Sequence, residues 1–216
     1  QKRRQSNQTN NKQALIVGNP TMPTIEIEAG KPPVQLSNLP SSEQEAEKIA
    51  TLLKTQALTG NKATKAAIVQ RMELASIIHL ATHGILDNIR GLGSALAFTP
   101  SGNDNGLLTA DEILNLPLTA TDMVVLSACN TGRGRITGDG VIGLSRSFIS
   151  AGVPSVVVSL WAVPDDATAF LMTEFYQNLD KKLDKATALQ KAMQTTKLKY
   201  PNPRQWAAFT LIGEAG

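Results

Sequence analysis

Four apolar runs, separated by stretches with helical periodicity, constrain the fold of this chain more than any other feature. The runs span residues 14–18, 76–84, 124–132 and 153–160, and the last of them is apolar along almost its whole length. A strand of that kind is covered on both faces, as in a parallel sheet between two layers of helices. Strands that alternate with helices indicate the same architecture. The sequence therefore predicts an α/β fold, with a mostly parallel sheet flanked by helices on both faces.

The helices and remaining strands are predicted from periodicity, capping signals and turn residues. Ser42 with Glu45 and Thr109 with Glu112 each fit a capping box, in which both side chains bond backbone N–H groups at the start of a helix. Residues 19–40 contain five of the eleven prolines and are predicted to be a loop. Helices are expected at about residues 42–53, 64–72, 109–116, 140–151, 166–179 and 184–199, short strands near residue 58 and at 207–213, and a hairpin over residues 95–108.

Composition restricts the class of protein. A chain of 216 residues with 42% hydrophobic and 18% charged residues suits one folded domain. The net charge of +3 is too small by itself to indicate a nucleic-acid partner, and no apolar run approaches the ~18 residues of a membrane helix. Because one cysteine cannot form an internal disulfide, a reducing, cytoplasmic location is expected. Residues 1–13 are predicted to be a polar linker, and the chain, which begins with Gln1, is expected to be part of a longer protein.

Cys129 follows directly on an apolar run and is followed by small, polar residues. A lone cysteine is often only a small buried hydrophobe. However, His83 ends another apolar run in the same way, and ligands bind at the carboxyl ends of the strands of an open α/β sheet. If the two strands are neighbours, the imidazole of His83 can take the proton of the Cys129 thiol and return it to a leaving amine.

Gly84 adds a second element to this hypothesis. It follows His83 directly, and its lack of a side chain lets its backbone N–H point at a substrate carbonyl. The N–H groups of Gly84 and Cys129 are predicted to form an oxyanion hole, in which each donor contributes about 3 kcal/mol to catalysis.

Two further motifs are interpreted as structural. His79 and His83 are four residues apart in a predicted strand, a separation of about 13 Å, so they cannot share a metal ion. His79 is predicted to be a hydrogen-bonded core residue, and no metal site is expected. Residues 138–143 match G-x-G-x-x-G but do not follow their strand directly, as a dinucleotide-binding loop requires. We therefore expect no cofactor, and we interpret these glycines as residues that cap the next helix.

The last long apolar run is followed by Trp161, Asp165 and Asp166. Either aspartate can be the N-cap of the next helix. An acidic group beside an aromatic wall also suits a pocket for a lysine or arginine side chain. Both interpretations remain open on these residues alone, whereas Trp206 is predicted to be core packing.

Taken together, these residues resemble the CHAT domain, a peptidase family related to caspases, gingipains and separase. The matching segments follow the family's order over nearly the whole chain. They are residues 14–20, 79–84, 124–132, 138–152, 159–166 and 206–213. The resemblance implies a caspase-like fold and a catalytic dyad of His83 and Cys129. The pattern Leu-Trp-x-Val-x-Asp is similar to that of separase, which implies that Asp165 lines a pocket for a basic side chain, with Trp161 as its wall.

The expected function is that of a cysteine endopeptidase that cleaves a protein or peptide substrate after Arg or Lys. Family members often carry tetratricopeptide repeats, which implies that residues 14–216 are the C-terminal domain of a longer protein with an N-terminal repeat domain or a regulatory partner. Neither a nucleic acid nor a membrane is expected as a partner. The alternative is a catalytically silent CHAT module that acts through partner binding.

Overall fold

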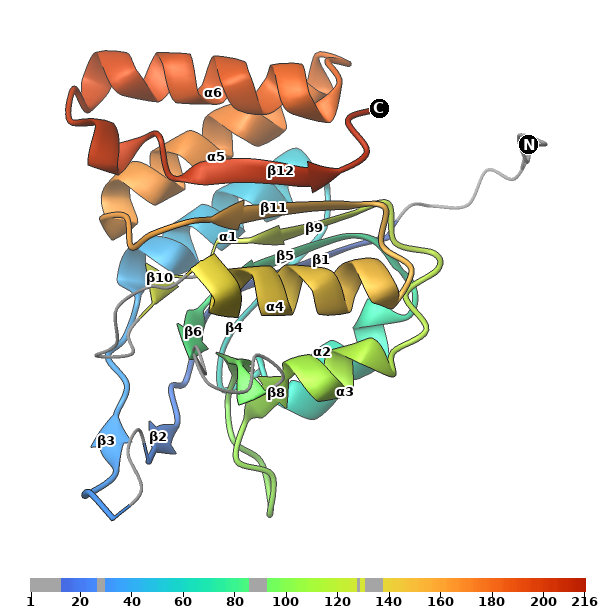
Figure 1. Cartoon of the computed structure of the whole chain (residues 1–216), viewed down its shortest axis with the longest axis vertical. Coiled ribbons are helices and arrows are strands. Elements are labelled where there is room, and N and C mark those ends of the chain that lie inside the picture. The colour runs from blue at the N-terminus through green and yellow to red at the C-terminus, as the bar shows by residue number, and fades with distance from the viewer. Residues whose placement is uncertain (1–12, 27–29, 86–92, 128, 131–137) are drawn as a thin grey trace.

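The computed structural model describes residues 13–26, 30–85, 93–127, 129–130 and 138–216, and its centre is a six-stranded sheet (Figure 1). The strand order is β12-β11-β9-β5-β1-β4. All neighbours are parallel except β12, which runs antiparallel to β11. The strands are β1 (Gln13–Pro20), β4 (Ala57–Gly60), β5 (Ala75–Ala81), β9 (Met123–Leu126), β11 (Ser155–Ser159) and β12 (Phe209–Gly213). The predicted mostly parallel sheet is confirmed.

In the described part of the chain, three helices cover each face of this sheet. Cores on the two sides join the sheet to α1, α5 and α6 on one face and to α2, α3 and α4 on the other. The helices are α1 (Pro40–Leu52), α2 (Lys65–Met72), α3 (Ala110–Leu114), α4 (Gly138–Ser150), α5 (Asp165–Asp180) and α6 (Lys185–Lys199). In β9, Val124 packs toward α4 and Val125 toward α5, so neighbouring residues supply both cores. This alternation explains why β9 is apolar at every position.

A second, four-stranded sheet lies at the carboxyl ends of β5 and β9. Its strand order is β10-β6-β7-β8. The strands are β6 (His83–Ile85), β7 (Ala95–Ala97), β8 (Leu107–Thr109) and β10 (Cys129–Asn130). The hairpin of β7 and β8 is the predicted one. A short pair, β2 (Thr24–Ile25) with β3 (Val34–Gln35), lies in the stretch that we predicted to be a loop.

The second sheet corrects the prediction that residues 76–84 form one continuous strand. The chain leaves the main sheet after Ala81 and enters the second sheet at His83. Between them, the hydroxyl of Thr82 donates a hydrogen bond to the carbonyl of Ala97 in β7. The break at Thr82 therefore transfers the chain from one sheet to the other, and it places His83 among different neighbours from His79.

Three predicted helix starts have different outcomes. The Thr109–Glu112 capping box is present at α3. The Ser42–Glu45 box is wrong, because α1 begins two residues earlier at Pro40, whose fixed φ suits the first helical position. The predicted caps Asp165 and Asp166 are the first two residues of α5, and its N-cap is Pro164.

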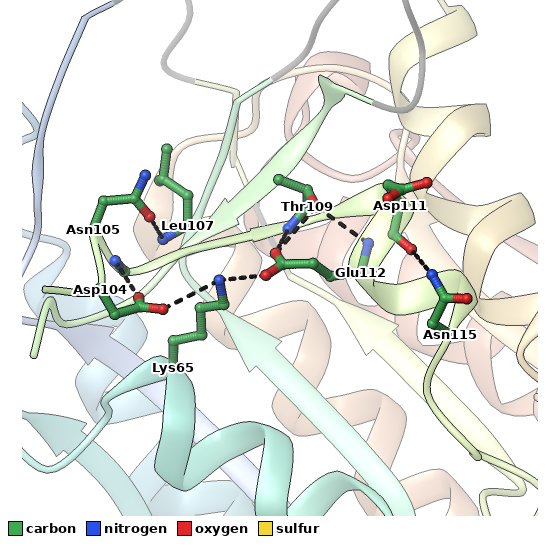
Figure 2. Close-up of polar contacts among 9 residues, drawn as sticks. Lys65, Asp104, Asn105, Leu107, Thr109, Asp111, Glu112 and Asn115 are labelled. Atoms are coloured by element: carbon green, nitrogen blue, oxygen red, sulfur yellow. Dashed lines mark hydrogen bonds and ion pairs between the residues drawn. The ribbon is translucent and has the colours of Figure 1, made fainter.

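Lys65, the first residue of α2, attaches this helix to the second sheet (Figure 2). Its Nζ lies 2.6 Å from Oε1 of Glu112 and 3.3 Å from Oδ2 of Asp104. The other carboxylate oxygen of Glu112 accepts hydrogen bonds from the backbone N–H and hydroxyl of Thr109. Burial disfavours ionisation of Glu112, but the hydrogen bonds from Lys65 and Thr109 outweigh it and hold the pKa of this carboxyl below its ordinary value. One carboxylate thus caps α3 and binds α2.

We expect Glu112→Gln to destabilise the protein by about 0.5 kcal/mol at pH 7, because the amide keeps the cap but loses a half-exposed ion pair. A carboxylate with a lowered folded pKa adds stability above its unfolded pKa, and this stability is lost as pH falls through the folded pKa. The difference from the parent chain should therefore be smaller at acidic pH, about pH 3, than at pH 7. Urea unfolding at both pH values measures it, and Asp111→Asn, an exposed neighbour on α3, is the control. An equal loss at both pH values would contradict the ion-pair explanation.

Candidate active site

His83 and Cys129 are directly opposite each other in the backbone of the second sheet. β6 and β10 are parallel neighbours, with His83 paired to Cys129 and Gly84 paired to Asn130. Neighbouring strands lie about 4.8 Å apart. The preceding strands β5 and β9 are also neighbours, as the sequence hypothesis required. The side chain of Cys129 and the glycine-containing loop at 131–137 lie outside the described part of the chain.

The imidazole of His83 is buried, with 1% of its surface exposed. Its Nε2 lies 2.7 Å from the backbone carbonyl oxygen of Ser37. Because a carbonyl can only accept a hydrogen bond, Nε2 is the nitrogen that donates. In the neutral ring the lone pair is then on Nδ1, which is the nitrogen able to accept a proton from a thiol.

The segment that supplies this carbonyl, residues 37–43, is itself held by two other parts of the fold. Asn19 at the end of β1 accepts a hydrogen bond from Leu39 N (2.8 Å) and donates one to Glu43 (3.0 Å). Asp165 at the start of α5 accepts hydrogen bonds from Ser41 N (3.0 Å) and the Ser42 hydroxyl (2.9 Å). The segment therefore joins the end of β1 and the start of α5 to the histidine.

The other predicted site residues occupy defined positions. Gly84 lies between Asn130 of β10 and Leu96 of β7, next to the histidine. Asp165 contacts the same segment as His83, four residues further along it. Trp161 is half-buried, and its indole N–H donates to the carbonyl of Arg204 at 2.9 Å. Gly84 thus adjoins His83, Asp165 is linked to it through the 37–43 segment, and Trp161 is held by Arg204, which precedes β12.

His79 is a core residue, as predicted. It is fully buried, and Nε2 lies 2.9 Å from Oε1 of Glu45, which is fully buried as well. Its other nitrogen lies 3.2 Å from the hydroxyl of Tyr176. Within the residues that the structure describes, no group of three or more His, Cys, Asp and Glu side chains is arranged to hold a metal ion.

The 37–43 segment is not recognisable from the sequence as part of the site. Its contribution to His83 is a backbone carbonyl, which any residue at position 37 supplies equally. Two signals were available: Pro40 at the first position of a helix, and Asn19, which adopts a left-handed conformation with φ 43° at the end of β1. Both indicate an ordered turn, but neither shows which distant residues the turn contacts.

Solved structures that are similar to this chain define its class of fold. Two solved structures match 96% of this chain: the Arg-specific cysteine proteinase gingipain R, with a TM-score of 0.63 and 13% identity, and the complex of the RgpB pro- and mature domains from Porphyromonas gingivalis, with a TM-score of 0.64 and 14% identity. The matches cover 48% and 49% of those chains. The fold is therefore the caspase-like α/β fold that gingipain R also has.

The family follows from the sequence comparison. The family model of the CHAT domain matches residues 1–214, so the chain belongs to the CHAT domain family. Tetratricopeptide repeat protein 28 from Mus musculus and its counterpart from Homo sapiens are each 31% identical to it over 240 residues. The match covers 93% of this chain but 9% of those proteins, so the chain spans a small part of their length. No helix in the described ranges is long and apolar enough to cross a membrane.

Proposed function

We propose that this CHAT domain is a cysteine endopeptidase in which His83 and Cys129 form the catalytic dyad. The observation that carries the proposal is the register of the second sheet, which pairs these two residues across β6 and β10. The hydrogen bond from His83 to the Ser37 carbonyl supports it, because it leaves Nδ1 as the basic nitrogen of the neutral ring.

The reaction follows from these groups. Nδ1 of His83 takes the proton of the Cys129 thiol, and the thiolate attacks the carbonyl carbon of the scissile peptide bond. The N–H groups of Gly84 and Cys129 stabilise the negative oxygen that develops. When the C–N bond breaks, the imidazolium protonates the leaving amine. A water molecule then hydrolyses the thioester and restores the thiol, and no cofactor takes part.

For specificity we propose cleavage after Arg or Lys, with Asp165 binding the basic side chain and Trp161 bordering the pocket. A carboxylate can accept about four hydrogen bonds. Two acceptor positions of Asp165 are used by Ser41 and Ser42, and the others are available to a guanidinium or ammonium group. Gingipain R, a protein of the same fold, is specific for Arg, which agrees with this choice.

Regulation is the third part of the proposal. The matched relatives are named for tetratricopeptide repeats and are far longer than this chain. We therefore place the domain in a longer protein, in which an N-terminal repeat region or a protein bound to it controls the site.

Labelling by cysteine-reactive peptide probes tests the proposal. A peptide acyloxymethyl ketone ending in arginine should label the parent chain, and Cys129→Ala or His83→Ala should prevent labelling. Asp165→Asn should slow the arginine probe by about tenfold relative to a leucine probe, which is about the effect of one charged hydrogen bond. Asp166→Asn, the exposed neighbour, is the matched control.

The outcomes separate the two functions. Labelling that needs both His83 and Cys129 supports the peptidase. An unlabelled parent chain would favour the silent interaction module. If Asp165→Asn slows both probes equally, the aspartate acts only by holding the 37–43 segment, and the assigned pocket is wrong.

A further inference from the structure

α6 and β12 lie at the end of the main sheet opposite β4 (Figure 1). Side chains of both elements line a groove. Its hollow measures about 430 Å³. Its apolar lining includes Leu189 and Met193 of α6 and Phe209 and Leu211 of β12. β6 and β10 belong to the other sheet, so this groove is distinct from the candidate active site.

One wall of the groove is an open strand edge. Within the described part of the chain, β12 pairs only with β11. The hydrogen bond from Leu160 N to Ala208 O, at 2.8 Å, makes Leu160 and Ala208 a bonded pair. Bonded and non-bonded pairs alternate along an antiparallel ladder. Phe209 and Leu211, which line the groove, are therefore in non-bonded pairs, and their N–H and C=O groups point away from β11.

The C-terminal end of the same edge confirms this alternation. Ala215, four residues beyond Leu211, has the same parity, and its carbonyl accepts a hydrogen bond from Lys185 N at 2.8 Å. The outward groups of Phe209 and Leu211 have no such partner among the described residues. An open edge of this kind is the template on which an extended peptide adds as a further strand.

Two N–H donors stand beside the open edge. Trp206 lines the groove, and its indole Nε1 is buried without an acceptor among the described residues. Buried donors are normally paired, so this one indicates that an acceptor is missing from the isolated chain. Lys197 Nζ lies 5.5 Å from the centre of the Trp206 ring. A carbonyl for the indole and a carboxylate for the ammonium group would satisfy both.

The charge of the segment that contains α6 indicates the kind of partner, and Lys197 places one of its positive charges in the lining of the groove. Residues 181–204 carry seven basic side chains and a single acidic one, Asp184. Pairing β12 with β12 of a second copy would bring two such basic surfaces together and cost Coulomb energy. An acidic partner gains from the same charges, in its encounter rate as well as in its selectivity.

We propose that β12 and α6 form a docking groove for an extended, acidic segment of a partner protein. The segment adds to the sheet as a strand on β12, places an apolar side chain in the hollow, and presents a carboxylate to Lys197. This inference does not depend on catalysis and holds for an active or a silent domain.

The test is selection from a phage-displayed library of random ten-residue peptides on the immobilised 216-residue chain. Selected peptides should alternate β-branched apolar residues with Asp or Glu. Their affinity, measured by fluorescence anisotropy, should fall about tenfold in Lys197→Glu and about fivefold in Trp206→Phe, which removes the indole donor but keeps an aromatic ring. Lys181→Glu makes the same change of charge outside the groove and should alter the affinity less than about twofold.

Three results would overturn the proposal. The first is that the library yields no peptide, or only peptides without acidic residues. The second is that the selected peptides bind Lys197→Glu and Lys181→Glu equally. The third is that sedimentation shows a dimer of the parent chain that Leu211→Pro dissociates, in which case the occupant of the edge is a second copy.

Discussion

Replacement of Cys129 by alanine is expected to abolish cleavage of an arginyl peptide, with a loss in kcat/KM of at least about 10,000-fold. The sulfur forms the bond to the substrate carbonyl, so the covalent route disappears with it. Alanine removes one atom and leaves the β10 backbone in register with β6. Turnover of a fluorogenic peptide measures the effect, and the melting temperature should stay within about 2 °C of the parent value.

The His83→Ala variant and the double variant complete this test. The two groups act as a unit, because His83 is the base for one nucleophile only. Removing both should therefore slow the reaction no more than removing Cys129 alone. A Cys129→Ala chain that cleaves at the parent rate, or single losses that add in the double variant, would contradict the dyad.

The fold was predictable from the sequence because the main sheet is encoded by local patterns. The apolar runs that become β5, β9 and β11 are recognisable without tertiary information, and α2 and α3 carry their own caps at Thr64 and Thr109. The second sheet was not predictable in the same way. Its strands β6 and β10 are three and two residues long and follow strands of the main sheet closely, so the pattern shows one run where the structure has two strands.

The candidate site was likewise predictable only in part. The pairing of His83 with Cys129 was predictable, since each residue ends an apolar run and such runs end at one edge of a parallel sheet. The contacts of the 37–43 segment were not. The sequence analysis assigned Ser42 to a local capping box, but its hydroxyl donates to Asp165, 123 residues away. When a residue that suits a local hydrogen bond is bonded to a distant partner, the surrounding sequence does not reveal that partner.

Replacement of His79 by leucine is expected to destabilise the fold by about 3–5 kcal/mol, although His79 has no part in the proposed chemistry. The imidazole lies between Glu45 of α1 and Tyr176 of α5, and all three side chains are buried. Burial and the negative charge of Glu45 raise the pKa of Tyr176 well above its ordinary value, so its hydroxyl stays protonated, 3.2 Å from Nδ1 of the ring. Leucine fills the space but leaves the Glu45 carboxylate without its partner.

The double variant distinguishes the lost pair from a simple packing defect. Glu45→Leu alone should also be strongly destabilising, but adding it to His79→Leu removes the unpaired carboxylate. The two losses should therefore not add, and the coupling from urea unfolding should reach about 2 kcal/mol. Glu47→Leu, an exposed position on the same helix, is the control. Additive losses would mean that His79 and Glu45 stabilise the fold independently. A coupled loss would show that this pair anchors α1, the helix that follows the Ser37 carbonyl, to the strand that leads to His83.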